Sequence, residues 1–159
     1  IRNRAAMFAL YSEILSFSQS ASVPLKPKAS YVIYNDIAYS NLLSIRLRRR
    51  FLERHAIRMR EEGYTLIYVG SQADKQKSPS CPSFIDHDFR GELSIPELFA
   101  LFFHSSVKRV ISFDTFIAHL ATLSKKEMYI VSKSKDTLDL VKNRFVPMLC
   151  LSDISLEIS

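Results

Sequence analysis

Short apolar runs alternate along the chain with segments of helical periodicity. Continuous β-branched or apolar runs predict strands buried on both faces, and they occupy residues 31–34, 65–69, 109–113, 127–131 and 145–151. Apolar residues spaced three and four apart predict amphipathic helices over residues 2–17, 41–62, 94–104, 114–124 and 134–143. A polar loop containing Pro79 and Pro82 is expected after residue 71, followed by a short strand over residues 83–86.

Capping residues and prolines indicate where several of the expected helices begin or end. Gly63 follows the long helix and is typical of a C-cap. Ser94, Pro96 and Glu97 combine an N-cap serine, an early proline and a capping-box glutamate, so a helix should begin there. The serine-rich stretch 18–30, which contains two prolines, cannot continue a helix and indicates a linker.

This order of elements predicts an α/β fold, a Rossmann-like parallel sheet with helices on both faces, preceded by a helix and a linker. We expect residues 1–29 to form the helix and linker and residues 30–159 to form the Rossmann-like domain. Ligands of such sheets bind outside the carboxyl ends of the strands. The chain opens at Ile1 within an expected helix, which suggests a piece of a longer protein with a neighbouring domain.

Composition narrows the partners without selecting one. Lys and Arg number 22 against 16 acidic residues, a net charge of +6, which favours nucleotide phosphates, nucleic acid or acidic lipid. The chain has no apolar run of membrane-spanning length and no signal pattern, which suggests a cytoplasmic location. Cys81 and Cys150 are far apart in sequence, as expected for reduced, partly buried thiols.

Several function classes lack their sequence signals. His55, His87 and His104 have no partners at ligand spacing, so no metal site is expected. Dinucleotide, ATP and hydrolase motifs are absent, as are the aromatic and glycine signatures of nucleic-acid modules, so no nucleic-acid partner is expected.

The segment 109–121 carries the strongest chemical signal. A buried strand ends at Asp114 and Thr115, a helix starts there, and His119 follows five residues after the aspartate. Free N–H groups and the positive end of the helix dipole can receive a phosphate, with the Thr115 hydroxyl as a further donor. Alternatively, Asp114 is simply an N-cap and His119 an ordinary histidine.

Three pieces of sequence, in order, resemble the C-terminal half of the heptosyltransferase family, glycosyltransferase family 9. Residues 67–74 look like the family's strand and glycine turn with its acidic residue, and residues 91–98 look like its glycine, Leu-Ser and Glu-Leu helix start. Residues 111–121 are similar to its signature Asp-Ser/Thr-Gly-x-x-His. The resemblance extends over most of residues 2–143.

The resemblance implies a GT-B architecture, in which two Rossmann-like domains face one cleft and the C-terminal domain holds the nucleotide of the donor. Family members are metal-independent inverting enzymes without cofactors, and their catalytic base lies on an N-terminal domain that we expect to be missing here. The chain alone would therefore not complete catalysis. The implied donor-binding residues are Asp114, Thr115, His119, Ser40, Arg46, Gly70 and Asp74.

By the same resemblance, a nucleotide-sugar would supply a heptose-like sugar to a lipopolysaccharide or other bacterial surface-glycan acceptor, at a cytoplasmic site peripheral to the inner membrane. Two departures leave alternatives open. Phe116 replaces the signature glycine, and the loop after the first strand has Ser40 but no cation before Arg46. The chain could instead be a degenerate, non-catalytic interaction module.

A run of arginines on the helix over residues 41–62 offers another alternative. Its members are Arg46, Arg48, Arg49, Arg50, Arg54, Arg58 and Arg60. They would form either a solvated face or a basic surface for anionic lipid or RNA. A mixed interpretation has Arg46 at the donor phosphate and the others at an anionic membrane.

Overall fold

The computed structural model describes residues 12–13, 16, 21–37, 42–113, 115–131 and 148–150, and for 42–47, 131 and 148–150 only the backbone. Residues 12, 13 and 16 are helical, and residues 21–30 contain no helix or strand. The remainder of the helix expected over 2–17, and the helix expected over 134–143, lie outside the described residues.

The described strands form one parallel sheet. They are β1 (Tyr31–Asn35), β2 (Thr65–Tyr68), β3 (His87–Asp88), β4 (Val107–Phe113), β5 (Glu127–Val131) and β6 (Met148–Cys150). Their order across the sheet is β3-β2-β1-β4-β5-β6, and every neighbouring pair is parallel. The predicted α/β, Rossmann-like fold is confirmed, and the strand order is that of the doubly wound nucleotide-binding sheets.

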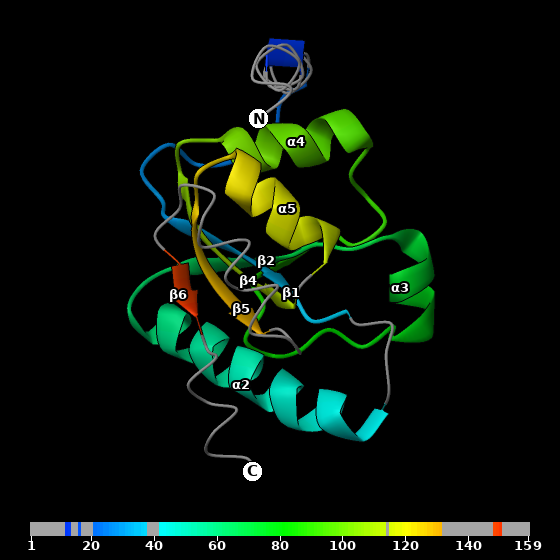
Figure 1. The fold of residues 1–159 in the computed structure, drawn as a ribbon. Helices are drawn as coiled ribbons and strands as arrows, with labels where there is room; N and C mark the ends of the chain where they lie inside the picture. Colours follow the sequence, from blue (N-terminus) through cyan, green and yellow to red (C-terminus); the bar gives the residue numbers. More distant parts are fainter. Residues whose placement is uncertain are drawn as a thin grey trace, which may run out of the picture.

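Helices cover both faces of the sheet (Figure 1). Helix α2 (Leu42–Glu61) lies on one face, and α4 (Ile95–Phe103) and α5 (Phe116–Leu123) lie on the other. Successive side chains of a strand point to opposite faces. Accordingly, Ile33 packs in the cluster shared with α4 and α5, while Tyr34 packs in the cluster shared with α2.

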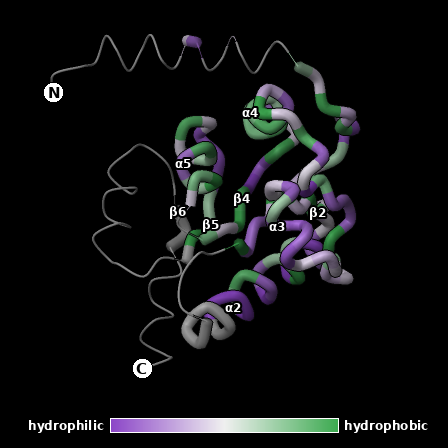
Figure 2. Tube along the Cα trace, turned by 90° about the vertical axis from the view of Figure 1, so that its right-hand side faces the viewer, coloured by the Kyte–Doolittle hydropathy of each residue, from purple (hydrophilic) through white to green (hydrophobic). Residues whose placement is uncertain are grey.

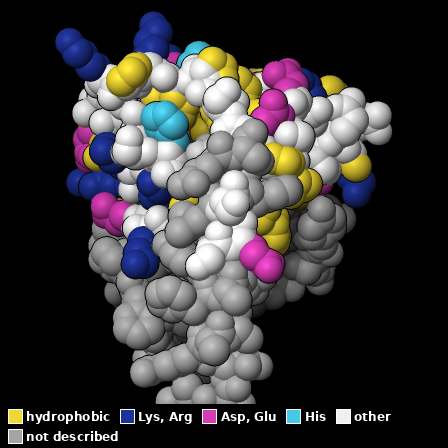
Figure 3. Space-filling view, turned by 90° about the horizontal axis from the view of Figure 1, so that it is seen from above, with side chains coloured by type: hydrophobic (Ala, Val, Ile, Leu, Met, Phe, Trp, Pro, Cys, Tyr) yellow, Lys and Arg dark blue, Asp and Glu magenta, His cyan; other side chains and the backbone are white. Residues whose placement is uncertain are grey.

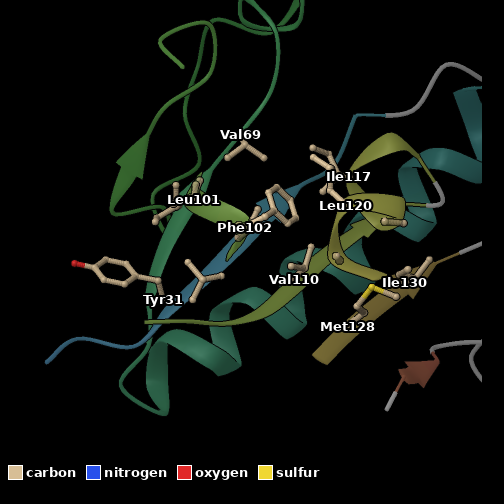
Figure 4. Packing of buried hydrophobic residues seen from close by; sticks show 14 residues of the cluster. Tyr31, Val69, Leu101, Phe102, Val110, Ile117, Leu120, Met128 and Ile130 are labelled. Carbon is tan, nitrogen blue, oxygen red and sulfur yellow. The ribbon is translucent and has the colours of Figure 1, made fainter. Parts of the chain in front are cut away.

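The two faces have different cores. Figure 4 shows the α4–α5 side, where Phe102, Val110, Ile117 and Leu120 pack together with side chains from several strands. Helix α2 is mostly hydrophilic along its length (Figure 2) and contributes a narrow apolar stripe: Leu52, Ala56 and Met59. In the part of the chain that the structure describes, no helix is long and apolar enough to cross a membrane.

The segment between β2 and β4 differs from the prediction. The expected polar loop contains a helix, α3 (Gln72–Lys77), which begins with a capping box between Ser71 and Asp74. The strand expected over residues 83–86 is wrong: β3 lies one residue beyond it, at His87–Asp88. The reason is that the Asp86 carboxylate accepts a hydrogen bond from Leu66 N at 2.9 Å, which anchors this stretch as a loop against β2.

Candidate functional site

A cavity of about 490 Å³ lies at the carboxyl ends of the strands. Strand order reverses between β1 and β4, because the chain winds toward β2 and β3 on one side and toward β5 and β6 on the other. Loops leaving the strands diverge at such a switch point, and a crevice remains there. The lining is Asn35, Ile37, Val69, Gly70, Ser71, Gln72, Asp74, Phe89, Gly91, Leu93, Ile95, Leu98, Thr115, Phe116 and Ile117.

Two glycines allow the loops after β2 and β3 to meet at the cavity wall. Gly91 N donates to Gly70 O at 2.9 Å. Gly91 has a φ of +73°, and a Cβ placed on it would overlap Gln72 Oε1. A Cβ on Gly70 would lie 2.8 Å from Ile37 Cδ1. Side chains at either position would therefore displace the loops that shape the cavity.

Thr115 places an unused hydroxyl at the start of α5. It is the N-cap residue of this helix, yet its side chain makes no capping hydrogen bond. Its Oγ1 is buried and has no hydrogen-bond partner among the described residues. An α-helix leaves the N–H groups of its first turn without intrahelical partners, and the helix dipole makes this end electropositive. The wall formed by Thr115, Phe116 and Ile117 can therefore receive an anion or another acceptor.

Asp74 also lines the cavity, but its carboxylate is hydrogen-bonded to Ser71 in the same turn. Its Oδ2 accepts hydrogen bonds from Ser71 N at 2.8 Å and from Ser71 Oγ at 2.6 Å. In return, Asp74 N donates to Ser71 Oγ at 3.2 Å. The side chain thus fixes the turn that follows Gly70 and shapes the wall.

The mouth of the cavity is apolar. Ile95 is 56% exposed and Phe116 is 55% exposed, and each is the first residue of its helix. Viewed from above, the face that carries α4 and α5 shows hydrophobic side chains between charged ones (Figure 3). No Lys or Arg occurs among the described residues that line the cavity.

Among the remaining predicted site residues, His119 is the one whose side chain the structure describes. Ser40 and Asp114 lie outside the described residues, and Arg46 is described only as backbone of α2. His119 lies on α5 as an exposed residue and is not part of the described lining. Of the predicted set, Gly70, Asp74 and Thr115 line the cavity.

Asn35 and Gly91 belong to the lining and were not predicted. Asn35 Nδ2 donates to Val69 O at 2.8 Å, and its Oδ1 accepts from Ile37 N at 3.3 Å. The amide therefore ties the end of β1 to the end of β2. The sequence contained a signal for Asn35, because it is a polar residue directly after the strand predicted over residues 31–34. The same kind of signal identified Thr115.

A buried polar network lies on the α2 side of the same strand ends. The Tyr34 and Tyr68 hydroxyls both donate to the Asp36 carboxylate, and Arg49 Nε lies 3.2 Å from Asp36 Oδ2. Burial raises the pKa of both tyrosines above the ordinary value, and the neighbouring carboxylate raises it further. Both phenols therefore stay protonated at neutral pH and act as donors.

Two further features of the described residues concern possible metal ligands and a cysteine. Among the described residues, no group of three or more His, Cys, Asp or Glu side chains could hold a metal ion. Cys81 is a free cysteine, but it is exposed, so its predicted partial burial is wrong. It lies in the loop after α3, where residues 78–80 are exposed as well.

Comparison with known proteins identifies the fold and leaves the family open. No family model matches the sequence, and no curated protein matches it. The structure is similar to that of E. coli ADP-heptose LPS heptosyltransferase II, with a TM-score of 0.52 and 14% sequence identity. The match covers 75% of this chain and 37% of the heptosyltransferase chain. This likeness supports the Rossmann-like α/β fold.

Proposed function

We propose that the chain binds the nucleotide of a sugar-nucleotide donor and is the donor-binding part of a glycosyltransferase. The observation that carries the proposal is the cavity at the β1–β4 switch point. Its wall contains the start of α5 and the Thr115 hydroxyl, which has no hydrogen-bond partner in the part of the chain that the structure describes. Nucleotides bind doubly wound sheets at this position, with phosphates at a helix N-terminus.

In this proposal, the phosphate oxygens accept hydrogen bonds from the backbone N–H groups of Phe116 and Ile117 and from Thr115 Oγ1. The positive end of the α5 dipole offsets part of the phosphate charge. Donor sugar and acceptor would meet outside this wall. The sequence resemblance and the similar solved structure, an ADP-heptose LPS heptosyltransferase, support a heptose-like sugar and a surface-glycan acceptor. Metal-independent transfer is proposed from the sequence resemblance alone.

Titration of the 159-residue chain with ADP, UDP and their sugar conjugates tests the proposal. Amide chemical shifts report the location, and we expect the largest phosphate-dependent changes at Phe116 and Ile117. Adding EDTA should leave the affinity unchanged. Absence of binding at millimolar nucleotide, with a circular dichroism spectrum of a folded protein, would refute the proposal.

A second candidate function, contact with an anionic membrane, is favoured by the exposed arginines of α2. Arg58 pairs with Glu62 at 3.4 Å and Arg60 with Asp86 at 3.2 Å. Arg50 and Arg54 are exposed and form no ion pair with a described acid. Basic residues near a membrane surface each contribute on the order of 1 kcal/mol to binding.

Vesicles with and without anionic lipid, the former with a surface potential of roughly −30 mV, test this candidate. We expect the Arg50→Glu/Arg54→Glu double variant to lose salt-sensitive binding. The Lys28→Glu/Lys108→Glu variant changes the net charge equally at exposed sites away from α2 and should retain it. Equal losses in both variants would indicate a general charge effect and refute a specific α2 surface.

A further inference from the structure

The cavity combines apolar walls, a small number of neutral polar groups and no lining cation in the described part of the chain. Its volume of about 490 Å³ falls within the range of small-molecule sites, which lies at roughly 300–1,000 Å³. Asp74, the described lining residue that carries a charge, uses its carboxylate within the capping box. Ionic attraction therefore has little part in this wall.

The aromatic side chain of Phe116 is largely exposed at the mouth of the cavity. Phe116 is 55% exposed although its neighbours Ile117 and Ala118 are buried in the core beneath α5. It lines the cavity beside Thr115, and more than half of its surface stays exposed to solvent. A flat ring of a ligand stacked on Phe116 would bury this apolar surface and gain the aromatic contact.

We infer that Phe116 is a specificity-determining residue that stacks on the nucleobase, so that ring stacking rather than phosphate charge supplies most of the affinity. The inference rests on the proposed function and names which part of the ligand is recognised. The inference also gives Phe116 a role. If close approach of the backbone to phosphate were the main interaction, a large side chain at this position would hinder binding.

The polar groups of the cavity fit this assignment. Thr115 Oγ1 is buried and has no hydrogen-bond partner among the described residues, so it can donate to a phosphate or ribose oxygen of a ligand whose base stacks on Phe116. Asn35 is already held by Val69 O and Ile37 N and serves to fix the wall. Ile95 provides a second exposed apolar side chain at the mouth, on α4.

Calorimetric titration with adenosine and uridine, which carry no phosphate, measures the stacking contribution directly. We expect at least one nucleoside to bind with most of the affinity of its diphosphate. The dissociation constant of that nucleoside should change less than about twofold between low and high salt, since no ion pair is broken. Phe116→Ala and Phe116→Gly should weaken nucleoside binding roughly tenfold.

Matched variants distinguish aromatic stacking from the effect of side-chain size and from a general loss of stability. Phe116→Tyr should retain binding, while Phe116→Leu, which keeps an apolar side chain without a π face, should fall between wild type and alanine. Ile57→Ala removes a comparably exposed hydrophobic residue from α2 and should have no effect. Thermal melting should be nearly unchanged in all of them, because the substituted side chains are exposed.

Two results would overturn the inference. In the first, Phe116→Ala leaves nucleoside affinity unchanged while ADP still shifts the Phe116 and Ile117 amides, so that the proposed function survives alone. In the second, Phe116→Gly strengthens binding of ADP, as expected if the ring only obstructs phosphate. If neither nucleosides nor nucleotides bind the wild-type chain, the proposed function fails and this inference fails with it.

Discussion

Arg90 holds the carboxylate of Asp88 at two points, with Nε 2.9 Å from Oδ1 and Nη2 2.9 Å from Oδ2. The arginine is fully buried, and its guanidinium lies over the Tyr68 ring, 4.1 Å from the centroid. Its remaining donors reach Ser78 O at 2.7 Å and Ser80 O at 3.3 Å. One side chain therefore ties β3, β2 and the loop after α3 together beside the cavity wall.

Replacing Arg90 with alanine should lower the free energy of unfolding by about 3 kcal/mol, because a buried pair loses one partner and two carbonyl groups lose their donor. Urea unfolding followed by circular dichroism measures the change. Arg58→Ala breaks the exposed pair with Glu62 and should cost less than about 1 kcal/mol. Similar losses in the two variants would contradict the structural role of Arg90.

The same pair should make stability depend on pH in the acid range. Hydrogen bonds from Arg90 hold the pKa of Asp88 below its ordinary value, so the folded state binds this proton less readily than the unfolded state does. The stabilisation is therefore complete above the ordinary Asp pKa of about 3.9 and is lost as pH falls through the lower folded pKa.

Asp88→Asn should consequently flatten the dependence of unfolding free energy on pH between about pH 5 and pH 2, although it lowers stability at neutral pH. Urea unfolding at a series of pH values gives the slope. Glu92→Gln, which removes an exposed pair with Lys75 at 3.4 Å, serves as the control and should follow wild type. A slope unchanged in Asp88→Asn would assign the acid sensitivity to other groups.

The fold was predictable from the sequence where local pattern dominates. Residues 31–34 and 127–131 are apolar or β-branched over most of their lengths, and both form strands of the sheet. The segment 71–88 was predicted less well, because its two prolines and many polar residues outweighed the capping-box spacing of Ser71 and Asp74. The position of β3 depends on Asp86 reaching Leu66 across the sheet, a tertiary interaction that no local pattern reveals.

The site was predictable only in part, for a related physical reason. Gly70 and Thr115 each follow a buried strand, so the parallel sheet alone places them at one edge. Gly91 comes close to Gly70 and Gln72 because of the register between β2 and β3. The local sequence of neither strand predicts that register. Phe116 stands where the heptosyltransferase signature has glycine. The sequence resemblance therefore indicated that Phe116 would hinder phosphate binding and did not indicate that it lines the cavity.

Gly91→Ala should destabilise the protein by more than Gly63→Ala does. Both glycines have positive φ, +73° and +98°, so both substitutions carry the backbone strain of an L-residue. A methyl group added at Gly63 would have nothing within 4 Å, whereas one added at Gly91 would overlap Gln72 Oε1 and lie 2.9 Å from the main chain of Gln72. The difference should be about 1–3 kcal/mol, the usual cost of overpacking.

Denaturant unfolding of the two variants measures this difference, and Gln72→Ala in the Gly91→Ala background tests its cause. The second substitution removes the side-chain clash and leaves the close approach to the main chain of residue 72, so it should restore part of the lost stability. No restoration would mean that backbone strain at residue 91 and the close approach to the main chain of Gln72 account for the whole effect.

Thr115→Val should lower the affinity for ADP without lowering the free energy of unfolding. Losing an N-cap threonine usually costs about 1 kcal/mol, but the Thr115 side chain makes no capping bond, so this loss should not appear. Removing a buried hydroxyl that has no partner among the residues described should instead leave the unfolding free energy unchanged or slightly higher. Affinity for ADP should fall about tenfold if the hydroxyl donates to the ligand, as measured by calorimetry.

Thr122→Val, in the same helix, is the matched control for Thr115→Val. Thr122 Oγ1 donates to Ala118 O at 3.0 Å and does not line the cavity, so this variant should lose a little stability and no affinity. The two variants thus have opposite expected effects on the two measurements. If Thr115→Val instead lowers stability by the amount of a lost cap and leaves the affinity for ADP intact, then the hydroxyl caps α5 in solution, and the polar anchor assigned to the ligand must be sought elsewhere in the wall.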